Sequence, residues 1–133
     1  MLDQIARAGH RLTAPRRAIV GALAGRRGYF RAEEILAEAK RAAPGTGRAT
    51  VYRMLEILSE LGLVEQLHLG EGNHGFVLGR RGHHHHLICS ICGRVMEFQG
   101  CGLPEEISSI AEEHQFRIEG HQLEVYGRCW SCS

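Results

Sequence analysis

The sequence predicts an α+β fold in two modules: a winged helix-turn-helix over residues 1–79 and a small α/β domain over residues 86–133, joined by a hinge at 80–85. Three observations predict this division. The apolar spacing of residues 1–60 is helical, and their net charge is +5. Residues 61–133 carry a net charge of −4, all five cysteines and eight of the nine histidines. A basic part without soft metal ligands, followed by an acidic part that holds them, indicates two modules.

The composition restricts the class of protein. With 133 residues, 44% hydrophobic content and only three prolines, the chain can form two small folded domains. No apolar run reaches the roughly 20 residues that cross a bilayer. The opening residues "MLDQIARAGHRL" lack the features of a signal peptide. We therefore expect a cytoplasmic protein, in which paired cysteines are metal ligands or redox groups rather than structural disulfides.

Apolar spacing and capping residues predict the first helices. A short amphipathic segment starts at Leu2 and ends near Gly9. Thr13 can cap the next helix, whose first turn holds Pro15 and which ends near Gly25. A third helix is expected over residues 32–42, before the helix-breaking pair Pro44-Gly45. The apolar residues expected on the inner faces are Ile19, Ala22 and Leu23 in the second helix, and Ile35, Leu36 and Ala39 in the third.

The fourth helix, "GRATVYRMLEILSELG", has the most regular pattern of the chain. Its buried stripe is expected to be Val51, Met54, Leu55, Leu58 and Leu61. The alternating segments of "LVEQLHLGEGNHGFVLG" flank a Gly-rich turn, which is typical of a β-hairpin. Helices followed by a two-stranded wing describe a winged helix-turn-helix.

The exposed side of the fourth helix suggests double-stranded DNA as a partner. It begins with Arg48, Thr50, Tyr52 and Arg53, and such residues in the first turns of a helix suit contact with base edges in the major groove. Arg11, Arg16 and Arg17 would contact phosphates. The alternative is a small helical domain whose arginine-rich face is only solvated. Because a charge of +5 is modest, one copy would bind DNA weakly, and two copies would be needed.

Two cysteine pairs predict a structural zinc site. Cys89 and Cys92 form one Cys-x-x-Cys motif, and Cys129 and Cys132 form a second one. Two such pairs complete a tetrahedral Cys₄ site with no open position. Two disulfides are a poor alternative for a cytoplasmic chain, and a redox dithiol would need one pair only.

The run of four histidines before the first cysteine pair predicts two further groups of ligands. In an extended segment His83 and His85 point to one face, and His84 and His86 to the other. His83 and His85, with Cys101 and His121, would form an N₃S regulatory site that suits zinc, because a thiolate is a soft ligand. Glu105 or Glu106 could replace Cys101, which would then be a buried small residue or a spare thiol. His121 is expected on a strand formed by "RIEGHQLEVYG".

A second ion could be held at the hinge. His84 and His86 would bind it together with Glu65, His68 and His74 of the hairpin, tying the wing to the second module. The alternative is that the hairpin residues only decorate a solvated face.

The chain resembles the ferric uptake regulator (Fur) superfamily over almost its whole length. The matching stretches are "AGHRLTAPR", "RATVYRMLEILSELGLV", "HHHHLICSICGRVMEF" and "HQFRIEGHQLEVYGRCWSC". The four histidines and the cysteine after "EF" look most like the zinc uptake regulator (Zur) branch. The resemblance implies a homodimer, formed through the C-terminal strands and helix, that binds AT-rich inverted repeats and represses metal-uptake genes when it is loaded with metal.

The resemblance also implies roles for individual residues. Tyr52 and Arg53 would contact bases and phosphate, and Arg11 would reach toward the minor groove. The structural zinc would lie at the two cysteine pairs and the sensory site at His83, His85 and His121. Where the iron branch has a histidine before its third helix this chain has Tyr29, and Val77 stands at the position of the iron branch's hinge glutamate. These departures favour zinc over iron(II) or manganese(II) as the regulatory ion.

The expected mechanism is metal-controlled positioning of two DNA-binding modules. Metal near the histidine run would hold both recognition helices at a half-site spacing of about 34 Å, whereas Gly79 and Gly82 would leave the metal-free hinge flexible. An iron- or peroxide-responsive regulator of the same family is the alternative. A zinc-dependent enzyme is disfavoured, because no nucleophile constellation or pocket for a small-molecule substrate is evident, and no membrane partner is expected.

Overall fold

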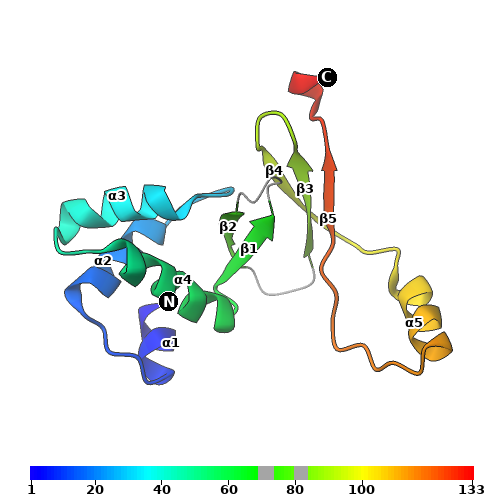
Figure 1. Ribbon diagram of the computed structural model, residues 1–133, viewed down its shortest axis with the longest axis horizontal. Helices are drawn as coiled ribbons and strands as arrows, with labels where there is room; N and C mark the ends of the chain where they lie inside the picture. The colour runs from blue at the N-terminus through cyan, green and yellow to red at the C-terminus, as the bar shows by residue number, and fades with distance from the viewer. Residues whose placement is uncertain (69–73, 80–83) are drawn as a thin grey trace. The chain divides into compact units, whose positions relative to one another are not determined.

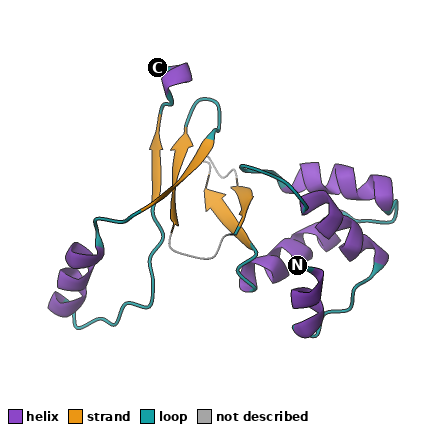
Figure 2. Ribbon diagram, turned by 180° about the vertical axis from the view of Figure 1, so that it is seen from behind, coloured by secondary structure: helices purple, strands orange, loops and turns teal. Residues whose placement is uncertain are grey.

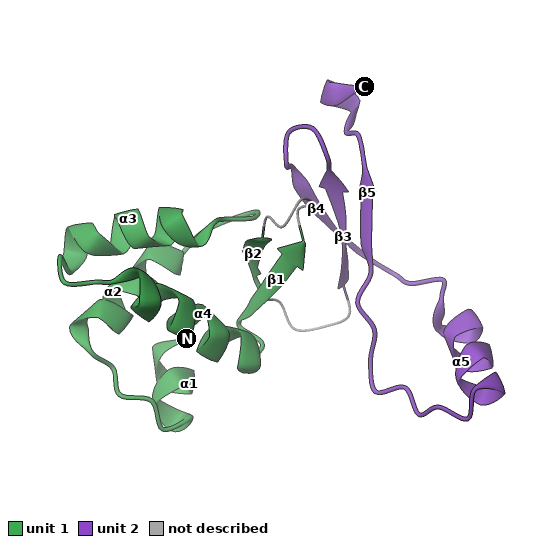
Figure 3. Ribbon diagram, in the orientation of Figure 1, with its two compact units in different colours: residues 1–81 green, residues 82–133 purple. Residues whose placement is uncertain are grey.

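The computed structural model describes residues 1–68, 74–79 and 84–133, which form two compact units. Unit 1 spans Met1–Arg81 and unit 2 spans Gly82–Ser133 (Figure 3). The division falls in the predicted hinge, residues 80–85. Of these, 80–83 lie outside the described residues and 84–85 belong to a strand.

Unit 1 is a winged helix-turn-helix, which confirms the fold predicted for it (Figure 1). Its helices are α1 (Leu2–Arg7), α2 (Ala14–Leu23), α3 (Ala32–Ala42) and α4 (Arg48–Glu60), and its strands are β1 (Val64–His68) and β2 (His74–Leu78). As predicted, the Thr13 hydroxyl accepts a hydrogen bond from the backbone N–H of Arg16 at the start of α2 (3.5 Å). At α3 the Glu34 carboxylate accepts from the backbone N–H of Arg31 (2.7 Å).

The helices of unit 1 enclose one apolar core. Ile19 and Leu23 of α2 meet Ile35 of α3 and Leu55 and Leu58 of α4, and these side chains are almost completely buried. Burial of each such side chain contributes about 1.5–3 kcal/mol. Leu61, expected in the stripe of α4, caps the end of the helix and is only partly buried against the core. Unit 1 therefore has a core of its own.

The wing is attached to the helices at two points. Phe30 and Phe76 exchange two backbone hydrogen bonds of 2.8 Å, and their rings lie 6.1 Å apart. At the base of the hairpin, the Gly79 N–H donates to the Leu63 carbonyl (2.9 Å), and a Cβ on Gly79 would lie 2.5 Å from the Gly62 carbonyl oxygen. Gly79 is thus required by close backbone approach. Gly79 therefore belongs to the base of the wing, and the expected flexibility of the metal-free hinge stays a prediction, since Gly82 lies outside the described residues.

Unit 2 is a three-stranded sheet with one helix. Its strand order is β4-β3-β5, in which β3 (His84–Cys89) pairs antiparallel with β4 (Val95–Gln99) and parallel with β5 (Glu124–Gly127). Helix α5 (Pro104–Glu113) stands apart from the sheet on long connections (Figure 2), and a short 3₁₀ turn, η1 (Trp130–Cys132), follows β5. The strand expected over "RIEGHQLEVYG" is shorter than predicted: it begins at Glu124, so His121 lies in the preceding loop.

Among residues 1–68, 74–79 and 84–133, none of the helices has the length and apolar character required to span a membrane.

Candidate metal centres and nucleic-acid interface

The two cysteine pairs lie on two turns at one end of the sheet of unit 2. Cys89 ends β3, and the turn after it closes with a hydrogen bond from the Gly93 N–H to the Cys89 carbonyl (2.9 Å). Gly93 has a φ of 71°, a left-handed conformation that glycine adopts without strain. The second turn closes from the Cys132 N–H to the Cys129 carbonyl (2.8 Å). The β3–β5 pairing therefore brings both turns together.

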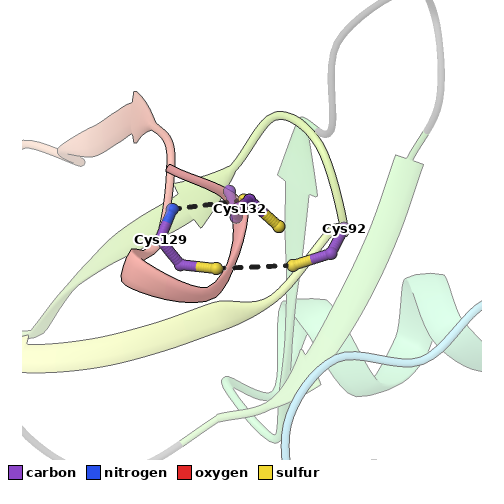
Figure 4. Close-up of side chains that lie close together, drawn as sticks. Cys92, Cys129 and Cys132 are labelled. Carbon is purple, nitrogen blue, oxygen red and sulfur yellow. Dashed lines mark hydrogen bonds between the residues drawn. The ribbon is translucent and has the colours of Figure 1, made fainter.

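The four sulfurs converge on one point. The Sγ atoms of Cys89, Cys92, Cys129 and Cys132 all lie within 4.8 Å of one another. Those of Cys92 and Cys129 are 3.7 Å apart (Figure 4). Four sulfurs at about 2.3 Å from a tetrahedral zinc ion would be separated by about 3.8 Å. The residues present therefore fit a zinc ion, which they would bind with thiolates alone.

Ionisation of these thiols is uneven. Backbone N–H groups of Cys92, Cys129 and Ile91 lower the pKa of Cys89 to about 6. Hydrogen bonds to the sulfurs of Cys129 and Cys92, with burial, raise the pKa of Cys132 to about 12. Four thiolates this close would repel one another, so a divalent cation is needed before all four can lose their protons.

A second cluster joins three separate segments of unit 2. His85 lies in β3 and is completely buried, Cys101 precedes α5, and His121 precedes β5. The Cys101 Sγ lies 3.3 Å from His121 Nε2, and the rings of His85 and His121 stack at 5.4 Å. One ligand atom from each residue lies within 4.8 Å of the others. A zinc ion with ordinary bond lengths would hold its sulfur and nitrogen ligands about 3.6 Å apart, so these residues fit a zinc ion as well.

Two residues predicted for the same cluster are placed differently. Glu105 lies in the first turn of α5, is exposed, and is not within the group that His85, Cys101 and His121 form; the same holds for Glu106. His83 lies outside the described residues, so its part in this cluster stays a prediction.

The residues predicted for the hinge site are divided between the two units. In the wing, His68 and His74 are a cross-strand pair with rings 5.3 Å apart. Glu65 pairs with Val77 and, three positions from His68, points to the opposite face of the hairpin. In unit 2, His84 and His86 share one face of β3. The hinge site stays a prediction, with His68 and His74 better placed than Glu65 to act together.

One residue near this face is missing from the predicted set. Glu97 of β4 lies opposite His86, and its carboxylate is 3.5 Å from His84 Nδ1. The register of a hairpin closed at Cys89–Cys92 would have identified it, because alternation places Glu97 on the same face as His84 and His86.

The residues predicted to contact DNA lie at two places in unit 1. Arg48, Thr50, Tyr52 and Arg53 occupy the first two turns of α4, and all but the half-buried Thr50 are exposed. Arg11 is exposed in the loop before α2, where Arg16 Nη1 donates to its carbonyl (2.8 Å). Arg16 thus orders the loop that presents Arg11, while it retains donors for other contacts.

Sequence reasoning also missed Glu33 of α3. Its Oε1 accepts hydrogen bonds from Tyr52 Oη (3.2 Å) and from Arg48 Nη2 (3.1 Å). No local pattern indicates this contact, because α3 and α4 are brought together only by tertiary packing.

Known proteins resemble this chain over nearly its full length. Residues 7–126 match the sequence model of the ferric uptake regulator family. The ferric uptake regulation protein of Bacillus subtilis is 35% identical over 135 residues, which cover 98% of this chain and 90% of that protein. The peroxide operon regulator of the same organism is 33% identical over 132 residues, covering 99% and 90%. A zinc uptake regulator solved in complex with zinc and DNA is 27% identical, with a TM-score of 0.73 over 96% of this chain and 87% of that one.

Proposed function

This chain belongs to the ferric uptake regulator family and is a metal-responsive transcriptional regulator. On that basis we propose that zinc is the ion to which it responds. The proposal includes binding of AT-rich inverted repeats by a homodimer and repression of metal-uptake genes in the zinc-loaded state. The cell compartment would be the cytoplasm, where such DNA is found.

The observation that carries the choice of zinc is the sulfur in the second cluster. Cys101 Sγ lies 3.3 Å from His121 Nε2, beside the buried His85. Thiolate and imidazole are soft and borderline ligands that suit zinc, whereas iron(II) and manganese(II) favour sites with carboxylate oxygens. Since Glu105 is outside this group, the described ligands contribute no carboxylate. We assign the regulatory site to His85, Cys101 and His121, with His83 as the fourth ligand.

The cysteine cluster would hold a second zinc ion with a structural role. All its ligands are thiolates and no coordination position would remain open, which is typical of structural zinc. Unit 2 spans only residues 82–133. In domains of about this size the apolar core alone supplies little stability, which a metal, a disulfide or a partner chain often supplements.

Exposed apolar side chains in unit 2 support the homodimer. Leu87, Met96 and Val125 are cross-strand neighbours on one face of the sheet and are 37%, 49% and 41% exposed. On α5, Ile110 is 56% exposed and no residue of the helix is buried. A row of apolar residues on a small domain marks an interaction site, and a second copy would cover it. Sedimentation equilibrium of the zinc-loaded protein should give twice the chain mass.

The regulatory ion would act through the segment that leads from one unit to the other. His85 is the second residue of β3, the strand that begins directly after residues 80–83, whereas Cys101 and His121 lie in the loops before α5 and β5. A bound ion would supply coordinate bonds that fix the start of β3 to these loops. The chain's own residues would then restrict the orientations of unit 1, and with them the position of α4. Coupling of about 1–3 kcal/mol would tighten DNA binding 5- to 150-fold.

The experiment that tests this function is a gel-shift titration on DNA from the chain's own promoter region. Zinc, iron(II) and manganese(II) are supplied separately at buffered free concentrations. We expect zinc to induce binding at the lowest free concentration. Stimulation by iron(II) at a lower level than zinc would support the iron- or peroxide-responsive alternative, and binding that is independent of every metal would contradict both.

A further inference from the structure

The first two turns of α4 are in contact with a carboxylate of α3. Glu33 Oε1 accepts from both Arg48 Nη2 (3.1 Å) and Tyr52 Oη (3.2 Å), and the Arg48 guanidinium lies 5.5 Å from the centre of the Tyr52 ring. Arg48 and Glu33 are 69% and 55% exposed and Tyr52 is 38% exposed. The three residues therefore form a surface cluster, the Glu33 cluster, in which one carboxylate holds two donors.

The carboxylate is charged at neutral pH. Its own backbone N–H, the Tyr52 hydroxyl, and the charges of Arg48 and Arg31 together lower the pKa of Glu33. Glu33 also lines a surface groove of about 710 Å³ in unit 1, together with Tyr52, Glu56 and Glu60 of α4. The three carboxylates of this groove outnumber the one arginine among its described lining residues, Arg31. The side of α4 next to the cationic first turn is thus anionic, and a phosphate would be repelled from it.

We propose that Glu33 is a specificity-determining residue of DNA binding, an internal carboxylate that competes with DNA for the donors of Arg48 and Tyr52. This inference rests on the proposed function. A carboxylate oxygen and a phosphate oxygen are both anionic acceptors, and a guanidinium binds each with similar geometry. DNA that takes the donors of Arg48 Nη2 or Tyr52 Oη must therefore displace Glu33 from them.

The competition should weaken nonspecific binding more than operator binding. A nonspecific duplex is bound mainly through its phosphates, so replacing the Glu33 contact exchanges one charged acceptor for another and gains little. An operator also offers base edges in the correct register, and these additional hydrogen bonds offset the loss of the Glu33 contact. Glu33 would accordingly raise the ratio of specific to nonspecific affinity.

The test uses the full-length, zinc-loaded protein and its Glu33→Gln variant. One duplex is enriched from a random library by the parent protein, and the other is a scrambled duplex of the same base composition. For E33Q we expect affinity for the scrambled duplex to rise roughly fivefold, the effect of one unit charge about 4 Å away in water. Affinity for the enriched duplex should change less. The slope of log affinity against log salt concentration on the scrambled duplex should become steeper by about one, because Arg48 becomes available to a phosphate and one more counterion is released.

Two further variants separate this role from a general charge effect. Glu60→Gln removes the same charge from the last residue of α4 and should leave the ratio of the two affinities near that of the parent. In an Arg48→Gln background, E33Q should raise nonspecific affinity less than it does in the parent, because only the Tyr52 hydroxyl is then released.

The outcomes are distinct. If the parent binds the enriched duplex but E33Q leaves both the affinity ratio and the salt dependence unchanged, or lowers affinity for both duplexes alike, the inference is wrong and the proposed function stands. If the parent enriches no duplex and binds neither DNA, the proposed function fails and the inference fails with it.

Discussion

The two ligand clusters of unit 2 differ in ligand type and completeness. The cysteine cluster gathers four sulfurs from two tight turns at one end of the sheet. The second cluster gathers two imidazoles and one thiol from β3 and two long loops. A closed set of four thiolates on tight turns is suited to permanent occupancy, whereas a described set of three ligands, two of them on loops, is suited to exchange. The same small sheet can thus hold one ion for stability and another for sensing.

The largest expected effect follows from loss of a cysteine-cluster ligand. Cys89→Ser removes one of the four ligands, so the structural zinc should be lost. Zinc binding at such sites contributes about 10–16 kcal/mol to folding. This is comparable to or larger than the roughly 5–15 kcal/mol stability of a whole domain. We expect unit 2 to unfold and the dimer to dissociate, while unit 1 keeps its helices, since its core is separate. Hydrogen exchange and zinc analysis would measure this. A variant that retains protected β3 amides and its zinc would contradict the structural role.

The next effect is a loss of response without a loss of fold. In His121→Ala the regulatory site loses a ligand that lies in a loop, outside the strands. We expect zinc to stimulate DNA binding no longer, while zinc at the cysteine cluster and the dimer persist. The control is His114→Ala, which removes an imidazole at the end of α5. If His121→Ala responds to zinc as the parent does, the regulatory assignment is wrong.

A smaller change is expected when the ligand is altered in kind. In Cys101→Ser a weakly binding hydroxyl replaces the thiolate, so zinc affinity at the regulatory site should fall by roughly tenfold or more. The preference for zinc over iron(II) should narrow, because the softest ligand is gone. Competition with a zinc chelator of known affinity would measure both. An unchanged affinity would show that Cys101 is a spare thiol.

The smallest effect is expected at Glu105. Because its carboxylate is not part of the described cluster, Glu105→Gln is an ordinary surface substitution, worth at most about 0.5 kcal/mol. The zinc concentration that half-saturates DNA binding should shift by no more than about twofold. A much larger shift would place Glu105 among the ligands and weaken the argument for a soft site.

Much of the fold could be predicted because its signals are local. The apolar period of α4 and the cap at Thr13 are properties of short stretches, and each forms as expected. The doubled Cys-x-x-Cys motif is also local, since each pair requires one tight turn. The convergence of the two pairs followed from zinc chemistry and not from any knowledge of the sheet order.

The remainder depends on tertiary packing. The alternation in "RIEGHQLEVYG" continues upstream of β5, yet pairing with β3 begins only at Glu124, so His121 is a loop ligand. Arg48 and Tyr52 are 15 and 19 positions from Glu33 in the sequence, and they contact it only because α3 packs beside α4. By contrast, strand alternation alone places Glu65 and His68 on opposite faces of the wing. The predicted hinge site, which groups these two residues, does not take this alternation into account.

The difference between the clusters is tested most directly by one chelator titration of the zinc-loaded protein, in which zinc content and DNA binding are followed in the same sample. We predict two classes of zinc in equal amounts: a weakly held class whose release parallels the loss of DNA binding while the dimer persists, and a tightly held class whose release unfolds unit 2. If both ions leave together, or if DNA binding survives the release of the weakly held class, the division into a structural and a sensing site is wrong.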